Sequence, residues 1–307
     1  MNTEIDDTFA SRLSEVALTV SAFLDEKIGE TTGDGFDWPA TLRAAMRHGA
    51  LNGGKRIRPF LVIETARMLG GDEKAAMYAA AALECIHCYS LIHDDLPAMD
   101  DDDMRRGQPT VHIAFDEATA ILAGDALLTF AFELLSDPAN AASAETKLEL
   151  VRKLAIASGA GGMVGGQVLD LAAETGNPDE NEIMSMQAMK TGALLRHACE
   201  AGAIVARADD ATICRMREFG TTIGLAFQLA DDLLDATADA ATVGKATGKD
   251  AGRNKGKCFV TMVPNQASQG SKASAGRCSS ADPRRCENSP RCHWCCCVSR
   301  HCVCHSC

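Results

Sequence analysis

Apolar residues recur at three- and four-residue spacing through most of the first 236 residues, and this spacing places side chains on one face of an α-helix. The segments with this pattern are rich in alanine and leucine and span residues 5–28, 42–48, 60–68, 74–93, 115–135, 144–158, 182–206 and 211–236. The alternation typical of strands is scarce. Several segments are apolar on more than one face, as helices inside a bundle are. The pattern predicts an all-α fold, a large helical bundle.

This pattern ends near Lys257. Residues 258–307 contain no leucine and no isoleucine, and they hold ten of the chain's 14 cysteines. Cys292 and His293 belong to a group of soft ligands that a zinc module could use, but the spacings match no standard zinc pattern. We favour the other interpretation, a shifted reading frame fused to a genuine enzyme. We therefore expect one domain over residues 1–257 and a disordered tail over residues 258–307.

Composition and charge narrow the class of protein. The chain is 46% hydrophobic and 23% charged, which is typical of a globular protein, and its net charge of −12 opposes binding to nucleic acid. The first ten residues are acidic and lack the apolar run of a signal peptide. The most apolar stretch, 120–135, is interrupted by Asp125 and falls short of a bilayer-spanning length. We expect a cytoplasmic protein without a membrane span.

Two acidic runs lie far apart in the sequence, DDLPAMDDDD at 94–103 and DDLLD at 231–235. On a helix Asp231 and Asp235 lie one turn apart, so their carboxylates repel each other unless a cation lies between them. Paired carboxylates suit Mg²⁺, which takes its remaining ligands from water and substrate phosphates. A single acidic run is ordinarily a solvated helix face. Because both runs directly follow apolar helical stretches, we expect them at the mouth of the bundle.

Cations accompany these acids in the manner that a diphosphate requires. Residues 53–59 (GGKRIRP) place three cations in four positions, and Arg105 and Arg106 follow the first acidic run. Lys190 lies in a helical segment, and further lysines lie in the glycine-rich stretch 244–256, which lacks the P-loop pattern. Arginine gives bidentate hydrogen bonds to phosphate oxygens, and lysine gives a point charge.

Together these motifs resemble the trans-isoprenyl diphosphate synthases, most closely the bacterial farnesyl diphosphate synthases, over residues 1–257. The features that carry the resemblance, in a specific order and spacing, are GGKRIRP at 53–59, the first aspartate-rich motif with its Arg-Arg-Gly tail, Gly165-Gly166-Gln167 with Asp170, Lys190-Thr191, Phe227-Gln228 and the second motif at 231–235. The resemblance implies an all-α homodimer of the isoprenoid synthase type with a central apolar cavity. It also implies Mg²⁺-dependent head-to-tail addition of isopentenyl diphosphate to an allylic diphosphate, dimethylallyl or geranyl diphosphate.

The resemblance also implies a role for each matching residue. The implied metal ligands are Asp94, Asp100, Asp231 and Asp235. The implied cations at the allylic diphosphate are Arg105, Lys190, Lys245 and Lys255. The implied isopentenyl diphosphate ligands are Lys55, Arg58, His87 and Arg106, with Thr191 and Gln228 near the reacting ends. Because ionisation leaves a highly charged diphosphate, preorganised charge is the main requirement, and the catalytic set is Asp94, Asp100, Arg105, Lys190, Asp231 and Lys245.

Three residues on the helix before the first acidic run need separate interpretation. A lone histidine on an apolar helix is ordinarily a core or rim residue, and only the resemblance favours His87 as a ligand. Cys85 and Cys88 form a solitary Cys-x-x-Cys, which we interpret as packing residues.

Tyr89 lies five residues before Asp94, roughly 7 to 8 Å further along the helix at 1.5 Å per residue. This sequence resembles the bacterial, farnesyl-producing members of the family in two features. It has an aromatic residue, Tyr89, at this position, and it has a two-residue insertion, Pro97 and Ala98, in the first motif. We therefore expect chain growth to stop at farnesyl diphosphate, with core packing as the other interpretation of Tyr89.

Four other functions remain open. A terpene cyclase would share the first acidic motif, but it would carry an Asn/Ser/Glu-type metal motif in place of the second and would lack GGKRIRP. A non-catalytic partner subunit would have lost site residues, and none is missing before residue 257. A geranylgeranyl diphosphate synthase differs only in product length. A catalytically impaired synthase remains an alternative because of the aberrant C-terminus.

Overall fold

The computed structural model describes residues 2–29 and 37–237. Every described residue belongs to the first of the two units into which the chain divides, residues 1–262. The predicted domain boundary after Lys257 and the predicted tail over 258–307 lie outside the described residues.

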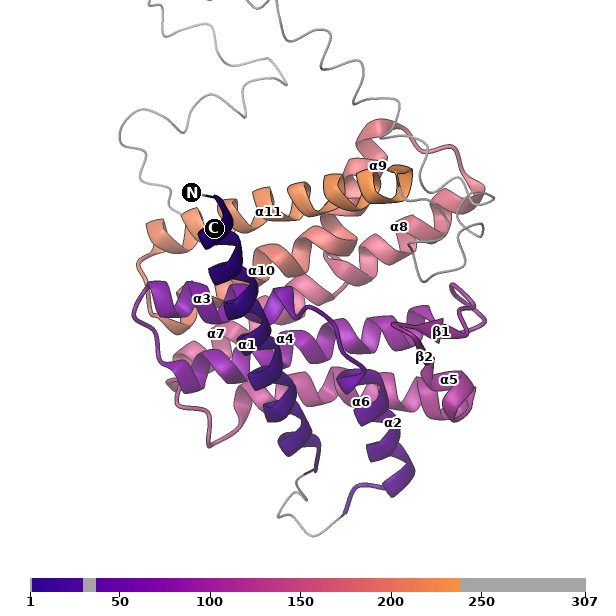
Figure 1. Cartoon of the computed structure of the whole chain (residues 1–307), viewed down its shortest axis with the longest axis horizontal. Helices are drawn as coiled ribbons and strands as arrows, with labels where there is room; N and C mark the ends of the chain where they lie inside the picture. Colours follow the sequence, from indigo (N-terminus) through magenta and orange to yellow (C-terminus); the bar gives the residue numbers. More distant parts are fainter. Residues whose placement is uncertain (1, 30–36, 238–307) are drawn as a thin grey trace, which may run out of the picture. The chain divides into compact units, whose positions relative to one another are not determined.

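The described chain is built almost entirely from helices, which confirms the predicted all-α fold (Figure 1). The helices are α1 (Asn2–Gly29), α2 (Ala40–Leu51), α3 (Ile57–Met68), α4 (Glu73–Asp94), α5 (Val111–Ala114), α6 (Glu117–Ser136), α7 (Ala144–Ser158), α8 (Met163–Thr175), α9 (Glu180–Gln187), α10 (Ala193–Val205) and α11 (Asp210–Thr237). A π-helical turn, η1 (Ala188–Gly192), joins α9 to α10. Two short antiparallel strands, β1 (Met104–Arg105) and β2 (Gln108–Pro109), form a hairpin after α4.

Helix α4 is the central element of the bundle. It packs along α6 and α3 and also contacts α10 and α2 (Figure 1). The Asp72 side chain begins the helix by accepting a hydrogen bond from Ala75 N, and the run from Ala79 to Leu83 is buried on every side. Because α4 ends at Asp94, the first acidic run lies at the end of a buried helix, as the sequence pattern indicates.

Three local features differ from the sequence expectation. The predicted helix over 115–135 is divided, because Asp116 accepts a hydrogen bond from Thr119 N and so begins α6 after the separate turn of α5. The sequence pattern did not predict α8, which contains Gly165 and Gly166 in its first turn, since glycine disfavours helix. The β1–β2 hairpin is too short to produce an alternating pattern.

Within residues 2–29 and 37–237, three stretches are long and apolar enough to cross a membrane by length and composition, Glu73–Asp94, Glu117–Ser136 and Ala144–Thr175. The expectation that residues 120–135 fall short of such a length is wrong, because the helix that contains them extends to 20 residues from its Asp116 cap. The apolar window of α4 is 78% buried inside the fold, whereas the windows in the second and third stretches are 44% and 39% buried.

Candidate active site

The loop from α2 to α3 carries the first predicted group of cations. Gly53 and Gly54 have φ angles of 89° and 118°, which are accessible mainly to glycine, and the loop ends at Arg56, the residue before α3. Lys55 is exposed. Arg58 is half-buried, and its Nε atom is buried without a hydrogen-bond partner among the described residues. Arg58 thus has donor capacity for a ligand.

Arg56 points away from this group and into the protein. Its side chain is only 3% exposed, and its Nη1 lies 2.5 Å from Glu84 Oε1 on α4. Its Nη2 donates a hydrogen bond of 2.5 Å to Ala50 O at the end of α2. Cys88 contacts the same guanidinium, and Cys85 and Cys88 are both buried free thiols, which confirms their interpretation as packing residues.

The β1–β2 hairpin brings two further arginines to the same end of α4. Arg105 donates bidentate hydrogen bonds to Asp95, with Nε to Oδ2 at 2.9 Å and Nη2 to Oδ1 at 2.5 Å. Arg106 donates through Nη1 to Gly53 O. A Cβ atom on Gly54 would lie 2.6 Å from the Arg106 guanidinium, so only glycine permits this approach. The hairpin and the loop are therefore fitted to each other.

His87 lies on α4 beside these arginines. Burial lowers the pKa of His87 well below its usual value, and the charges of four arginines lower it further. These are Arg58, Arg106, Arg56 and Arg105. A neutral imidazole next to concentrated positive charge is suited to hydrogen-bond an anion that the arginines attract. Of the predicted isopentenyl diphosphate ligands, the structure brings together Arg58, Arg106 and His87. Lys55 lies on the loop that leads into α3.

The aspartates at the end of α4 form the second part of the site. Asp94 is half-buried, and its pKa is raised to about 6, mainly by burial. The charges of Asp100 and Asp95 contribute to this rise, whereas the charges of Lys190 and Arg105 oppose it. The Asp100 backbone N donates a hydrogen bond of 2.8 Å to Asp94 O, which folds the acidic run back on the helix end. Crowded carboxylates of this kind bind protons or metal cations readily.

Lys190 approaches these aspartates from η1. Its Nζ donates to Asp170 Oδ2 at 2.5 Å, and Asp170 is a buried carboxylate on α8. A Cβ atom on Gly166 would lie 2.2 Å from Lys190 N, so glycine at this position lets α8 contact η1 directly. Thr191 follows Lys190 and is half-buried. The glycines of the 165–167 motif therefore position the lysine.

Helix α11 contributes the second acidic motif. Gln228 is half-buried and Asp231 is exposed. Burial lowers the pKa of Arg58, and the charge of Arg106 lowers it further. The charges of Glu84, Cys88 and Asp231 oppose this shift, so Asp231 lies within electrostatic range of Arg58. The Asp235 side chain lies outside the description, as do Lys245 and Lys255. Their assignments stay predictions.

Tyr89, the predicted limit to chain length, is buried on α4 with 6% exposure. Its ring makes an edge contact with His93 at a centroid distance of 5.8 Å. Burial raises the pKa of Tyr89 to about 12, and Asp94 adds to the shift. Its ring is thus a neutral, apolar surface near the aspartates.

The donor set at the end of α4 fits a divalent cation. Among the described residues, no group of three or more His, Cys, Asp or Glu side chains is arranged to hold a metal. Mg²⁺ does not require such a group, since one or two carboxylates plus substrate phosphates suffice. Asp94, whose pKa burial raises, and the neighbouring Asp100 supply carboxylates that a cation would stabilise in the charged form.

Sequence reasoning missed three carboxylates that organise the site. Asp95 pairs with Arg105, Asp170 pairs with Lys190, and Glu84 pairs with Arg56. For Glu84 a signal was present, because an acidic residue inside an otherwise apolar helix needs a buried cation. Asp95 gave no such signal, because it lies in a run where several acids compete for one role. Asp170 was noted only as part of the Gly165-Gly166-Gln167 motif and was given no role.

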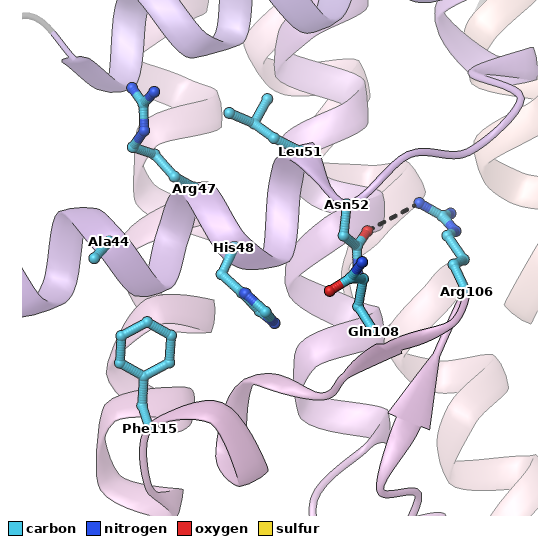
Figure 2. Close-up of a pocket in the computed structure, with 8 residues that line it drawn as sticks. All are labelled: Ala44, Arg47, His48, Leu51, Asn52, Arg106, Gln108 and Phe115. Carbon is cyan, nitrogen blue, oxygen red and sulfur yellow. Dashed lines mark hydrogen bonds between the residues drawn. The ribbon is translucent and has the colours of Figure 1, made fainter.

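A cavity of about 680 Å³ borders the arginine cluster, and Figure 2 draws the residues that line it. The residues that line it are Ala44, Arg47, His48, Leu51, Asn52, Arg106, Gln108 and Phe115. Arg106 and Asn52 face each other across one side, with Nη1 and Oδ1 3.4 Å apart. The cavity shares only Arg106 with the predicted site residues, so it lies next to the candidate site and does not contain its aspartates.

Comparison with known proteins places the chain in a family. Residues 39–288 match the polyprenyl synthetase family, whose members typically use divalent metal ions. The chain is 47% identical over 223 residues to farnesyl diphosphate synthase of Haemophilus influenzae, an alignment that covers 72% of this chain and 74% of the relative. It is 43% identical over 225 residues to the chloroplastic geranylgeranyl pyrophosphate synthase 11 of Arabidopsis thaliana. This second alignment covers 72% of this chain and 61%, less than two thirds, of that relative.

A solved structure agrees with these relatives. The crystal structure of an FPP/GFPP synthase from Zymomonas mobilis matches with a TM-score of 0.69 at 44% identity, covering 84% of this chain and 93% of that one. The chain belongs to the polyprenyl synthetase family and is a prenyltransferase of the farnesyl diphosphate synthase type.

Proposed function

We propose that this protein condenses isopentenyl diphosphate with dimethylallyl and then geranyl diphosphate to give farnesyl diphosphate, with Mg²⁺ as the metal. The observation that supports this most directly is the division of charge at the end of α4. Arg58 and Arg106 lie within electrostatic range of His87, while Lys190 lies within electrostatic range of Asp94. Two diphosphates bound side by side require this arrangement, one held by cations directly and one through metal.

The two parts of the site have different tasks in this proposal. Lys55, Arg58, His87 and Arg106 bind the diphosphate of isopentenyl diphosphate and hold its double bond toward the allylic substrate. Arg105 and Lys190 hold positive charge at the allylic diphosphate, and their ion pairs with Asp95 and Asp170 fix the side chains before substrate arrives. Thr191 and Gln228 lie near the reacting ends. Lys245 and Lys255 are proposed to add charge there.

Asp94, Asp100, Asp231 and Asp235 are the residues proposed to hold Mg²⁺. When bound, the metal neutralises the leaving diphosphate and so favours ionisation of the allylic substrate. The protein's own part is to keep the carboxylates crowded and to exclude water from the carbocation, for which the buried Tyr89 ring provides apolar surface.

Product analysis tests this proposal. The purified chain is incubated with isopentenyl and dimethylallyl diphosphates and Mg²⁺, and the dephosphorylated products are separated by chain length. Farnesol is the expected main product. Geranylgeraniol as the main product would favour a geranylgeranyl diphosphate synthase, the name that the Arabidopsis relative carries. A folded chain that gives no product would favour the impaired alternative.

The product length is tested further at Tyr89. Tyr89→Ala removes the ring that we propose as the limit to chain growth, so products should shift to geranylgeranyl or longer diphosphates. The chain's other tyrosine, Tyr78, provides a matched control. It lies on the same helix, is 1% exposed, and packs its ring against Phe23 of α1. Tyr78→Ala should lower stability and leave farnesyl diphosphate as the product. An unchanged product in Tyr89→Ala would place the limit elsewhere.

We also propose that the protein is a homodimer. Ile113, Ile121 and Leu122 on α5 and α6 are 50%, 45% and 58% exposed, and exposed large apolar side chains of this kind are available for an interface. A second copy of the chain is the proposed occupant. Light scattering should give twice the chain mass, and Leu122→Glu should give the mass of one chain.

A further inference from the structure

The buried pair of Arg56 and Glu84 lies directly behind the candidate diphosphate site. The two residues are 3% and 2% exposed, so neither can contact a substrate. Arg56 is nevertheless part of the same short segment as Lys55 and Arg58, whose side chains have access to the site. A charge buried at this position needs a structural explanation.

The Arg56 guanidinium connects four helices. Nη1 pairs with Glu84 Oε1 of α4, and Nη2 donates to Ala50 O, one of the last carbonyls of α2. Nε donates to Ser21 Oγ of α1 at 3.4 Å, and Arg56 itself precedes α3. The loop 52–55 is therefore held at both ends by one side chain, whose orientation depends on the Glu84 carboxylate.

The Arg56 backbone shows that this connection works against a local preference. Its φ of 50° is left-handed, a conformation that is unfavourable for a residue with a side chain. Such a conformation persists only where the surroundings impose it. The bonds from Glu84 and Ala50 supply this constraint, and Lys55 and Arg58 receive their directions from it.

The same loop also positions the hairpin. Gly53 O accepts a hydrogen bond from Arg106 Nη1, and the missing side chain at Gly54 makes room for the guanidinium. A change in the loop is thus transmitted to Arg106. Three cations of the candidate site, Lys55, Arg58 and Arg106, depend on one buried carboxylate that is remote from the substrate.

We propose that Glu84, acting through Arg56, is a positioning residue that sets the affinity for isopentenyl diphosphate. This inference rests on the proposed function and adds to it a residue that touches neither substrate. Asp94 lies ten residues after Glu84 at the far end of α4, and Lys190 and Asp231 lie on η1 and α11, outside the loop 52–55. We therefore expect the affinity for the allylic diphosphate to be independent of Glu84.

Steady-state kinetics of Glu84→Gln test this inference. The KM for isopentenyl diphosphate should rise about 10-fold or more, because small displacements of binding groups are costly, while the KM for geranyl diphosphate changes less than about twofold. A role in folding alone would reduce the amount of active enzyme and the melting temperature without separating the two KM values.

Two further variants keep the result interpretable. Glu200→Gln is the matched control, because Glu200 is also a buried carboxylate paired with cations, Lys153 and Arg217, but on α10. It should lower the melting temperature and leave both KM values unchanged. The double variant Arg56→Met with Glu84→Met removes both charges, so it should recover stability relative to Glu84→Gln while the KM for isopentenyl diphosphate stays high.

Direct titration with isopentenyl diphosphate tests the positioning role of Glu84 separately from the proposed function. If the wild-type protein binds it and Glu84→Gln binds it equally well, the positioning role is overturned and the proposed function stands. If the wild-type protein neither binds nor condenses it, the proposed function itself is overturned. Weaker binding by Glu84→Gln, with unchanged binding by Glu200→Gln, supports the positioning role.

Discussion

Glu84 and Glu200 are both buried and both paired with cations, yet their surroundings differ in charge balance. Burial alone would raise the pKa of Glu200, but hydrogen bonds from Lys153 and Arg217 hold it below its usual value. Two cations meeting one carboxylate there connect α7, α10 and α11. Near Glu84, burial lowers the pKa of Arg58 and of Arg106, because their charges are not fully compensated.

This difference separates two uses of buried charge. A compensated cluster joins helices and has no need of a ligand. An arginine cluster that remains under-compensated is maintained at a cost in stability, and an incoming anion removes that cost. The imbalance therefore supports the proposed position of the diphosphate site.

The largest effect on activity is expected at Asp94, which lies near the arginines whose charges are not fully compensated. Asp94→Asn removes a proposed metal ligand, so condensation should fall by about 10³-fold or more, since metal stabilisation of a leaving group amounts to several kcal/mol. Helical circular dichroism should not change. Asp231→Asn should behave in the same way. Normal turnover in either variant would contradict the proposed metal site.

Arg58→Met tests the claim that uncompensated charge serves binding. We expect kcat/KM for isopentenyl diphosphate to fall about 10²-fold, with no loss of melting temperature, because a disfavoured charge is removed. Lys153→Met in the compensated cluster should give the opposite result, a lower melting temperature with unchanged kcat/KM. If both variants affect the same property, the comparison fails.

Glu200→Gln tests the architectural role directly. Removing one partner of a buried pair should lower the free energy of unfolding by about 3 kcal/mol, as measured by denaturant titration. Activity per folded molecule should not change. A loss of activity at full stability would show that this cluster also serves the site.

The smallest effect concerns His197, which lies beside Glu200. It is 3% exposed, and its Nδ1 has no hydrogen-bond partner among the described residues. Burial lowers the pKa of His197 to about 4, so the unfolded chain binds the proton more readily than the folded one. Stability is therefore complete above about pH 6.5 and is lost as the pH falls toward 4.

Between pH 7 and pH 5 this loss should amount to about 2 kcal/mol. The raised pKa of Asp94 acts with the opposite sign, so the informative quantity is the difference between the wild-type protein and His197→Gln. The variant should show a flatter dependence of unfolding free energy on pH. Parallel curves would contradict the assignment.

The fold was predictable because helical periodicity is local and repeated over many turns. The ends of α4 and the place of the first acidic run followed from the same pattern. The division of residues 115–135 at Asp116 was signalled only by a capping residue followed by Thr119. Helix α8 gave the opposite signal, since its glycines serve a close contact with η1 rather than helix formation.

The site was predictable as a set of residue types and less so as a set of contacts. Cations and aspartates in a recurring order indicate diphosphate chemistry, but nothing in the sequence distinguishes Arg56, which is buried, from Arg58 two residues later. The distinction arises from the left-handed backbone at Arg56, which turns one side chain inward. Pairings such as Arg105 with Asp95 depend likewise on the hairpin, which the pattern did not show.

Among the described residues, the non-glycine residues with positive φ are Arg56, Asp101, Arg106 and Arg207, and three of these four lie in the loops around the candidate site. Each conformation costs about 1 kcal/mol that glycine would not incur. At these positions the backbone conformation that shapes the candidate site lowers the stability of the fold. A population of variants selected only for heat resistance should accumulate glycine at Asp101 and Arg106, and it should lose the reaction as it does so.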